Sequence, residues 1–160
     1  MKQTVVSNTS TLIFLAKLDA YNLAKNRFPE ILVPKQVLEE IFVKPTPEIN
    51  IIKDNLTTFL QEIEVKNIKD LPLGDGERSA ISYCLQNKYK LFLSDDKKAR
   101  RIARSLGLET VGILGILLWN LENKKINKIK FMNLFNNLIK KKYYISSDLY
   151  SRIMELIKNI

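Results

Sequence analysis

The groups in this sequence that are able to do chemistry are one amide and several carboxylates. Asn8 ends a short run that contains two valines, Asp95 and Asp96 follow a second apolar run, and Glu77 stands at the head of a helical pattern. The chain has no His and a single Cys, which excludes His general bases, His-dependent triads and His/Cys zinc sites. Hard oxygen ligands without His or Cys suit magnesium or manganese.

Asn8, Asp95 and Asp96 share one feature, which is that they follow predicted strands, at 4–7 and at 90–94. In a parallel sheet the carboxyl ends of the strands lie at one edge, where ligands bind, so we expect these side chains to be neighbours. Helix capping is the alternative explanation, by Asn8 or Ser10 after the first strand and by Ser94 or Asp95 after the second. Periodicity does not separate Asp95 from Asp96, because both lie near the apolar stripe of the next helix.

Glu77 heads the apolar face of a helix predicted at 77–87. The residues at i+3, i+4, i+7 and i+8 are Ala80, Ile81, Cys84 and Leu85, a face that should pack on the sheet. A carboxylate on a buried face is costly unless a partner compensates it. A half-exposed acid stabilised by the helix dipole is the alternative for Glu77. We expect Cys84 to pack in the core.

Glu39 and Glu40 lie on the helix that is predicted to follow a strand at 31–33. Both are off the centre of its apolar face by similar angles, so the pattern does not choose between them. A solvated acidic pair is the default interpretation for either. Together the candidates place one amide and two or three carboxylates at one edge of a small sheet. Clustered carboxylates repel one another and are hard to keep ionised without a cation.

The composition predicts a folded protein with a polyanionic partner. The 160 residues carry a net charge of +9, the isoelectric point is about 9.6 and 46% of the residues are hydrophobic. The excess of positive charge favours nucleic acid, and an abundance of Lys, Asn and Ile throughout the chain is the alternative, compositional explanation. A phosphodiester is the partner that needs both an acid cluster with divalent metal and a basic surround. Two metals about 3.5–4 Å apart activate a water and stabilise the leaving oxygen in such sites.

Strands and helices alternate over the first 120 residues, which predicts an α/β fold with a small parallel β-sheet flanked by helices. Strands are expected at 4–7, 31–33, 90–94 and 110–112, with a minor strand at 63–65. Helices are expected at 11–16, 21–27, 48–61, 77–87, 96–106 and 114–121, and another begins at Pro34. Residues 71–76 are predicted to be a loop. The C-terminal part is basic and helical, and its stripe of Phe131, Leu134, Phe135 and Leu138 is expected to be core or dimer packing.

No linker or repeat divides the sequence, so residues 1–160 are predicted to be a single domain. The lone Cys84 permits no internal disulfide, which fits a reducing compartment. The N-terminus lacks a signal-peptide pattern, and the longest apolar run, 111–119, is too short to span a bilayer. We therefore expect a soluble cytoplasmic protein without a membrane partner.

Four segments, in this order, resemble the PIN-domain nucleases, and most closely their VapC-like toxin branch. They are VVSNTSTLIFLAKL (5–18), ILVPKQVLEEI (31–41), LGDGERSAI (73–81) and LFLSDDKKARRIARSLGLETVG (91–112), and the ending KKYYISSDLYSRIMELI is also similar. The resemblance spans essentially the whole chain. It implies a parallel sheet wrapped by helices and a magnesium- or manganese-dependent ribonuclease site. It also implies a toxin paired with a small antitoxin protein, in a family where homodimers are common.

The same resemblance assigns the site residue by residue. The family's acids fall on Asn8, Glu40, Glu77 and Asp96, which are implied to be the catalytic residues and to hold Mg²⁺ or Mn²⁺. The fourth acid stands two positions after a strand-end hydroxyl, which is Ser94 here and selects Asp96 over Asp95. The position of the family's second acid falls on Glu40 and not on Glu39. Ser10 and Ser94 are implied to lie behind the ligands or to position the backbone.

Asn8 departs from the family, whose first ligand is usually an aspartate. An amide oxygen still coordinates a cation but brings no charge, so metal affinity should fall and one magnesium should bind better than two. Asp95 or Asp75 could supply the missing charge, and Asp95 is preferred because Asp75 lies off the Glu77 face. Reduced activity is the resulting expectation.

The leading hypothesis is therefore a metal-dependent endoribonuclease of the toxin type whose lysines bind the RNA backbone. The alternative is a PIN-like module that binds RNA or a protein without cutting, which the amide of Asn8 keeps open. A third hypothesis is a signalling domain whose aspartate accepts phosphate. It would require an acid at the end of the first strand, where this chain has Asn8.

Overall fold

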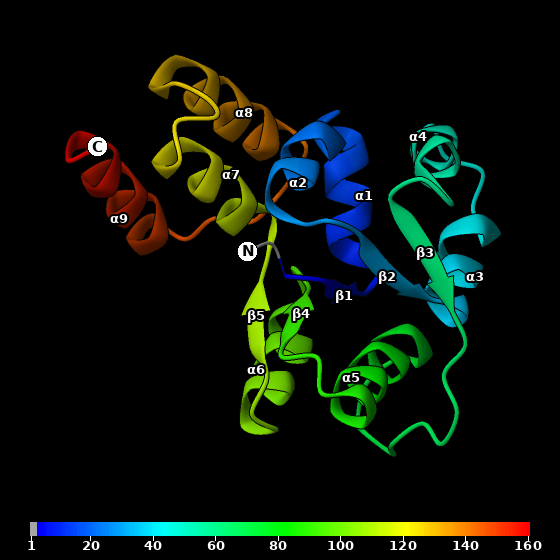
Figure 1. Cartoon of the computed structure of the whole chain (residues 1–160). Helices are drawn as coiled ribbons and strands as arrows, with labels where there is room; N and C mark the ends of the chain where they lie inside the picture. The colour runs from blue at the N-terminus through cyan, green and yellow to red at the C-terminus, as the bar shows by residue number, and fades with distance from the viewer. Residues whose placement is uncertain (1–2) are drawn as a thin grey trace.

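The computed structural model describes residues 3–160, and at its centre lies a five-stranded parallel sheet wrapped by helices (Figure 1). The strands are β1 (Val5–Ser7), β2 (Ile31–Pro34), β3 (Leu60–Ile63), β4 (Leu91–Leu93) and β5 (Glu109–Val111). The helices are α1 (Thr9–Lys17), α2 (Tyr21–Arg27), α3 (Lys35–Val43), α4 (Glu48–Asn55), α5 (Asp75–Asn87), α6 (Lys97–Ser105), α7 (Ile113–Glu122), α8 (Lys128–Lys140) and α9 (Ser147–Lys158). The predicted α/β class with a helical C-terminal part is confirmed.

Alternation along the strands explains why helices cover both faces of the sheet. On β1, Val5 belongs to a large apolar cluster with α1, α2 and α7, whereas Val6 belongs to a smaller cluster with α5 and α6. Leu91 and Phe92 repeat the same division on β4. Successive strand side chains point to opposite faces, so the central strands are apolar throughout. Cys84 is fully buried in the smaller cluster, which confirms its predicted packing role.

The strand order β3-β2-β1-β4-β5 places the N-terminal strand in the middle of the sheet. The chain adds β2 and β3 on one side of β1, then crosses over and adds β4 and β5 on the other. Val6 pairs with Phe92 and Ser7 with Leu93, so the carboxyl ends of β1 and β4 are level. A reversal of strand order of this kind opens a crevice between the two loops that leave the neighbouring strands.

One predicted helix is wrong in its second half. The apolar pattern from 48 to 61 was expected to be a single helix, but α4 ends at Asn55 and Leu60 begins β3, so the minor strand also lies earlier than 63–65. Thr57 adopts a positive φ of 66°, which ends the helical geometry. Leu60 then pairs with Ile31 of β2. The predicted loop at 71–76 is also too long, because α5 begins at Asp75.

The C-terminal stripe packs inside the molecule. Its four members, Phe131, Leu134, Phe135 and Leu138, are all buried, and α8 packs against α7. They therefore belong to the core. Helix α9 is held more loosely, since Ile153 is its only buried residue among those described. Within residues 3–160, no helix is both long and apolar enough to cross a membrane.

Candidate active site

Asn8 and Ser94 occupy equivalent places at the switch point of the sheet. Asn8 is the first residue after β1, and Ser94 is the first residue after β4. The main chains of the two strands stay paired to this point, because the Asn8 N–H donates to the Leu93 carbonyl oxygen at 3.1 Å. Both residues are buried, with Asn8 only 1% exposed. The two loops that leave the sheet therefore start in contact with each other.

The Asn8 side chain joins these loops by hydrogen bonds. Its Nδ2 donates to Ser94 Oγ at 2.8 Å, and its Oδ1 accepts from Ser10 Oγ at 3.0 Å. Each serine also accepts from the turn after β4: the Asp96 N–H donates to Ser94 Oγ at 3.1 Å, and the Asp95 N–H donates to Ser10 Oγ at 2.9 Å. Ser10, Ser94 and the amide thus orient the turn that carries both aspartates.

Glu40 reaches the same edge from α3. Its Oε1 accepts from the Gly76 N–H at 2.9 Å, and its Oε2 accepts from Thr9 Oγ1 at 2.7 Å. Residue 76 must be small for this contact, since a Cβ there would lie 2.8 Å from Glu40 Oε1. Glu40 therefore ties α3 to the start of both α1 and α5. Its neighbour Glu39 makes no hydrogen bond or ion pair within the described residues.

Glu77 is the carboxyl group whose pKa the neighbouring acids raise. Burial raises its pKa above the ordinary value of 4.5, and the negative charges of Asp96 and Glu40 raise it further. The Gly74 N–H, at 3.4 Å from Oε2, and the positive charge of Lys98 act in the opposite direction. Glu77 therefore lies within reach of the negative charges of both Glu40 and Asp96, and their effect on its pKa is only partly compensated.

Asp96 has a second role at this edge as the N-cap of α6. Its Oδ1 accepts from the Ala99 N–H at 2.8 Å. This bond fixes the carboxylate at the helix start and leaves its other oxygen without a hydrogen bond in the described part of the chain. Capping and participation in the acid group are therefore compatible for this residue.

The donor set fits a hard divalent cation in its chemistry. It consists of three carboxylates and one amide, all oxygen donors of the kind that magnesium and manganese prefer. Burial and then the negative charges of Asp96 and Glu40 raise the pKa of Glu77, and such a cation would relieve the repulsion. As the side chains lie, however, residues 3–160 contain no group of three or more His, Cys, Asp or Glu that could hold a metal ion. Binding would therefore require the carboxylates to move closer together.

Asp95, considered as an additional ligand, faces away from this group. Its carboxylate accepts hydrogen bonds from Thr11 Oγ1 at 2.6 Å, from Tyr143 O–H at 2.6 Å and from the Ile113 N–H at 3.0 Å. Burial raises the pKa of Asp95, and the three donors oppose that shift. A Cβ at Gly112 would lie 2.5 Å from Asp95 Oδ1, so only glycine leaves room for the carboxylate. Asp75, the other option, pairs with Arg78.

The comparisons with known proteins agree with the fold described above. A family model described as a PIN domain matches residues 4–159. The chain belongs to the PIN-domain family. No curated protein matches the sequence.

Solved structures share the fold of this PIN domain at low sequence identity. One is a PilT N-terminus domain protein, SSO1118, from the hyperthermophilic archaeon Sulfolobus solfataricus P2, with a TM-score of 0.58 and 19% identity. The match covers 75% of this chain and 95% of that protein. Another is the PIN domain endonuclease Utp24, with a TM-score of 0.54 and 10% identity over 69% of this chain and 84% of the other.

Three contacts of this PIN domain were not predicted from the sequence. In each of them a hydroxyl group donates a hydrogen bond to a carboxylate from a distant part of the chain. Thr9 donates to Glu40, and Thr11 and Tyr143 donate to Asp95. A weak signal exists for Thr11, which is a fully buried polar residue on an otherwise apolar helix face. Tyr143 gives no local signal, because its partner lies 48 residues earlier.

Replacing Tyr143 with phenylalanine should lower the free energy of unfolding by about 1.5–3 kcal/mol, because a buried carboxylate loses a charge-assisted donor. Urea denaturation at pH 7 measures the change. Tyr144→Phe is the matched control, since Tyr144 is 80% exposed and makes no hydrogen bond within the described residues. Equal losses in the two variants would contradict the role assigned to Tyr143.

Without divalent cations, Glu77→Gln should be more stable than the wild type at pH 7. The raised pKa of Glu77 means that ionisation destabilises the folded state, fully so above that raised pKa. Below the ordinary value of 4.5 the carboxyl group is protonated in both folded and unfolded chains, and the penalty disappears. Urea midpoints should therefore differ at pH 7 and converge toward pH 4. A difference that is independent of pH would show that ionisation of Glu77 is not its cause.

Proposed function

We propose that this PIN domain is a metal-dependent endoribonuclease in which Asn8, Glu40, Glu77 and Asp96 hold Mg²⁺ or Mn²⁺. The observation that carries the proposal is that Glu77 lies within reach of the negative charges of Glu40 and Asp96 beside the switch point of the sheet. The net charge of +9 suits a polyanionic substrate, and one structural neighbour is named as an endonuclease. Once bound, the cation would polarise the phosphodiester and lower the pKa of the attacking water.

The chain's own residues prepare this site in different ways. Thr9 and Gly76 hold Glu40 by both carboxylate oxygens, so it enters the site in a fixed orientation. Asp96 is fixed by its capping bond, and Glu77 is the least constrained of the three, with one long bond to Gly74. We therefore assign to Glu77 the adjustment that brings the carboxylates around a cation. Asp95 acts as a support for the turn, in place of the ligand role considered from the sequence.

The biological setting is proposed from the resemblance to the VapC-like branch. The protein would act in the cytoplasm as the toxin of a toxin–antitoxin pair, as a single domain over residues 1–160. A cognate antitoxin would bind it, and a homodimer is the expected assembly. The single Cys, buried and unpaired, agrees with a reducing compartment.

Glu40→Gln and Glu77→Gln should each reduce cleavage of single-stranded RNA with Mn²⁺ by roughly 10²-fold or more, because each removes a charge that holds the cation. Glu39→Gln is the matched control: it makes the same change one residue away on α3, outside the contacts described above. Gel analysis of a labelled RNA under single-turnover conditions measures the rates. Unchanged cleavage in Glu77→Gln with an intact fold would refute the nuclease proposal.

A second candidate function, RNA or protein binding without cleavage, is favoured by one observation. The Asn8 amide is buried, and both of its polar atoms are already hydrogen-bonded to serines.

The surroundings of residue 8 would also accept an aspartate. Both serine hydroxyls accept from main-chain N–H groups, which leaves their own protons able to turn toward residue 8. An aspartate fits the same space and would accept both protons, so the pocket does not need to change.

Asn8→Asp should therefore fold normally and bind Mn²⁺ more tightly, on the order of tenfold, since the added carboxylate raises the charge of the donor set. Calorimetric titration measures the affinity, and Asn22→Asp on α2 is a control for added charge at an exposed position. Cleavage by the native protein that increases in Asn8→Asp would support the enzyme. Cleavage that arises only in Asn8→Asp would identify the native protein as a binding module.

A further inference from the structure

A basic cavity lies beside the candidate active site, on another side of α6. It has a volume of about 650 Å³ and is bordered by α6, the α8–α9 connection and α9. Five basic side chains line it: Lys97, Arg100 and Arg104 from α6, Lys142 from the connection and Arg152 from α9. Asp95 is the one acid among its described lining residues, and three hydrogen-bond donors already satisfy that carboxylate. The cavity is therefore strongly positive.

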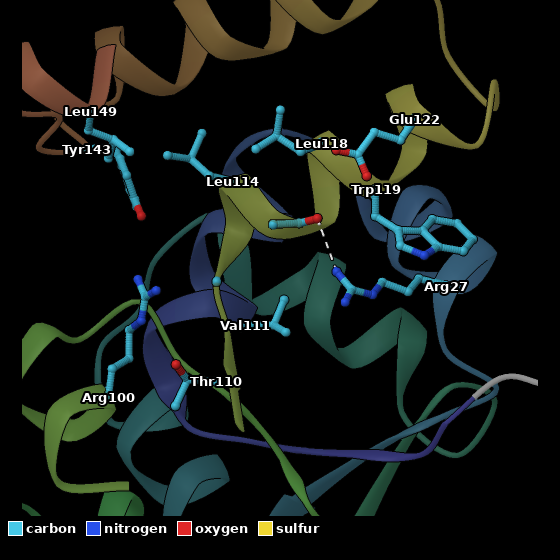
Figure 2. Close-up of a pocket in the computed structure, with 12 residues that line it drawn as sticks. Arg27, Arg100, Thr110, Val111, Leu114, Leu118, Trp119, Glu122, Tyr143 and Leu149 are labelled. Carbon is cyan, nitrogen blue, oxygen red and sulfur yellow. Dashed lines mark hydrogen bonds between the residues drawn. The ribbon is translucent and has the colours of Figure 1, made fainter. Parts of the chain in front are cut away.

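Lys97 and Lys142 have no acidic partner within the described residues, whereas the positive charge of Arg100 acts on Asp95 and opposes the rise in its pKa. Arg152 alone forms an ion pair, with Asp148 at 3.2 Å, and Arg104 Nε donates to Thr110 Oγ1 at 3.0 Å. Arg100 Nε is buried and has no hydrogen-bond partner in this part of the chain. Figure 2 shows the Arg100 guanidinium directed toward Tyr143, at the wall shared with a smaller neighbouring pocket. A buried N–H without a partner is costly, and an anionic oxygen would satisfy it.

Aromatic side chains accompany the cations. Tyr144 lines the cavity and is 80% exposed, and Phe14 and Tyr143 meet edge to face with ring centroids 5.0 Å apart. An exposed ring beside a row of cations is the combination that binds single-stranded nucleic acid, because bases stack on the ring while phosphates contact the cations. An acidic peptide would use the cations but has no group that requires the exposed ring of Tyr144.

The position of the cavity relates it to the acid group. Lys97 lines the cavity and directly follows Asp96 in the chain, and Asp95, on the cavity wall, directly precedes Asp96. A strand whose phosphodiester lies at Glu77 and Asp96 can therefore continue across the start of α6 into the cavity. Lys97 is exposed and makes no hydrogen bond or ion pair within the described residues, so it is available for a phosphate at this crossing.

We propose that this cavity binds the phosphate backbone of single-stranded RNA to one side of the cleavage position, with an unpaired base stacked on Tyr144. The inference rests on the proposed function only in taking the bound strand to be the substrate. Arg100 and Arg104 provide planar groups that contact phosphate oxygens in pairs, and Lys97 and Lys142 add point charges. The cavity thereby sets the path of the strand relative to the carboxylates.

The test measures binding separately from cleavage. Fluorescence anisotropy with a labelled 2′-O-methyl oligoribonucleotide in EDTA reports affinity without metal and without hydrolysis. Lys97→Gln/Lys142→Gln removes two exposed cavity charges, and Lys125→Gln/Lys128→Gln is the matched control, with two exposed lysines that do not line this cavity. We expect the first pair to flatten the salt dependence of log Kd by about 1.4, or about 0.7 for each phosphate, and the second to change it far less.

The stacking contact has its own pair of variants. Tyr144→Ala should weaken binding by roughly tenfold, whereas Tyr144→Phe keeps the ring and should bind as the wild type does. Equal losses in the two lysine pairs, or no difference between the Tyr144 variants, would overturn the proposal. If a polyglutamate peptide competes with the RNA and its binding is unchanged by Tyr144→Ala, the cavity would be assigned to an acidic protein instead. If RNA binds as expected but is not cleaved in Mn²⁺, the RNA-binding role of the cavity is supported and only the nuclease proposal is rejected.

Discussion

The level pairing of β1 with β4 is the constraint on which the rest of the site depends. It brings Asn8 and Ser94 to the same height, so that a single amide holds two loops together by hydrogen bonds to serines. Those serines in turn hold the main chain of the turn after β4. A shift of one residue in this register would reverse the direction of each side chain and remove the contact. The parallel sheet thus brings segments that are distant in the sequence together at one edge.

Neighbouring residues with the same chemistry perform opposite tasks at this edge. Asp95 accepts hydrogen bonds from α1, α7 and the α8–α9 connection, and its charge is satisfied inside the molecule. Asp96 caps α6, and its negative charge raises the pKa of Glu77. Glu39 and Glu40 differ in another way, because both are exposed but, within the described residues, only Glu40 accepts hydrogen bonds from α1 and α5. The fold thereby gives neighbouring acids of the same type different partners.

The sequence predicted the order of elements well, because strand and helix periodicities are local properties. It failed at Leu60, whose place in β3 depends on pairing with Ile31, a contact that no local pattern contains. It also did not distinguish Glu39 from Glu40, or Asp95 from Asp96, until the family resemblance was used. The angle of each side chain to its helix face is similar within each pair, and the difference lies in the partners. Gly76 and Gly112 show this clearly, since their missing Cβ atoms make room for Glu40 and Asp95.

The hydrogen bond from Tyr143 to Asp95 has a consequence for the order of events during synthesis. The ribosome makes the whole sheet, the acidic edge and α7 before it reaches Tyr143, which lies 48 residues after Asp95. Until that tyrosine docks, the buried Asp95 carboxylate lacks one of its donors and the turn that carries Asp96 is less firmly held. The nascent chain therefore completes this edge late, after most of its other contacts are in place.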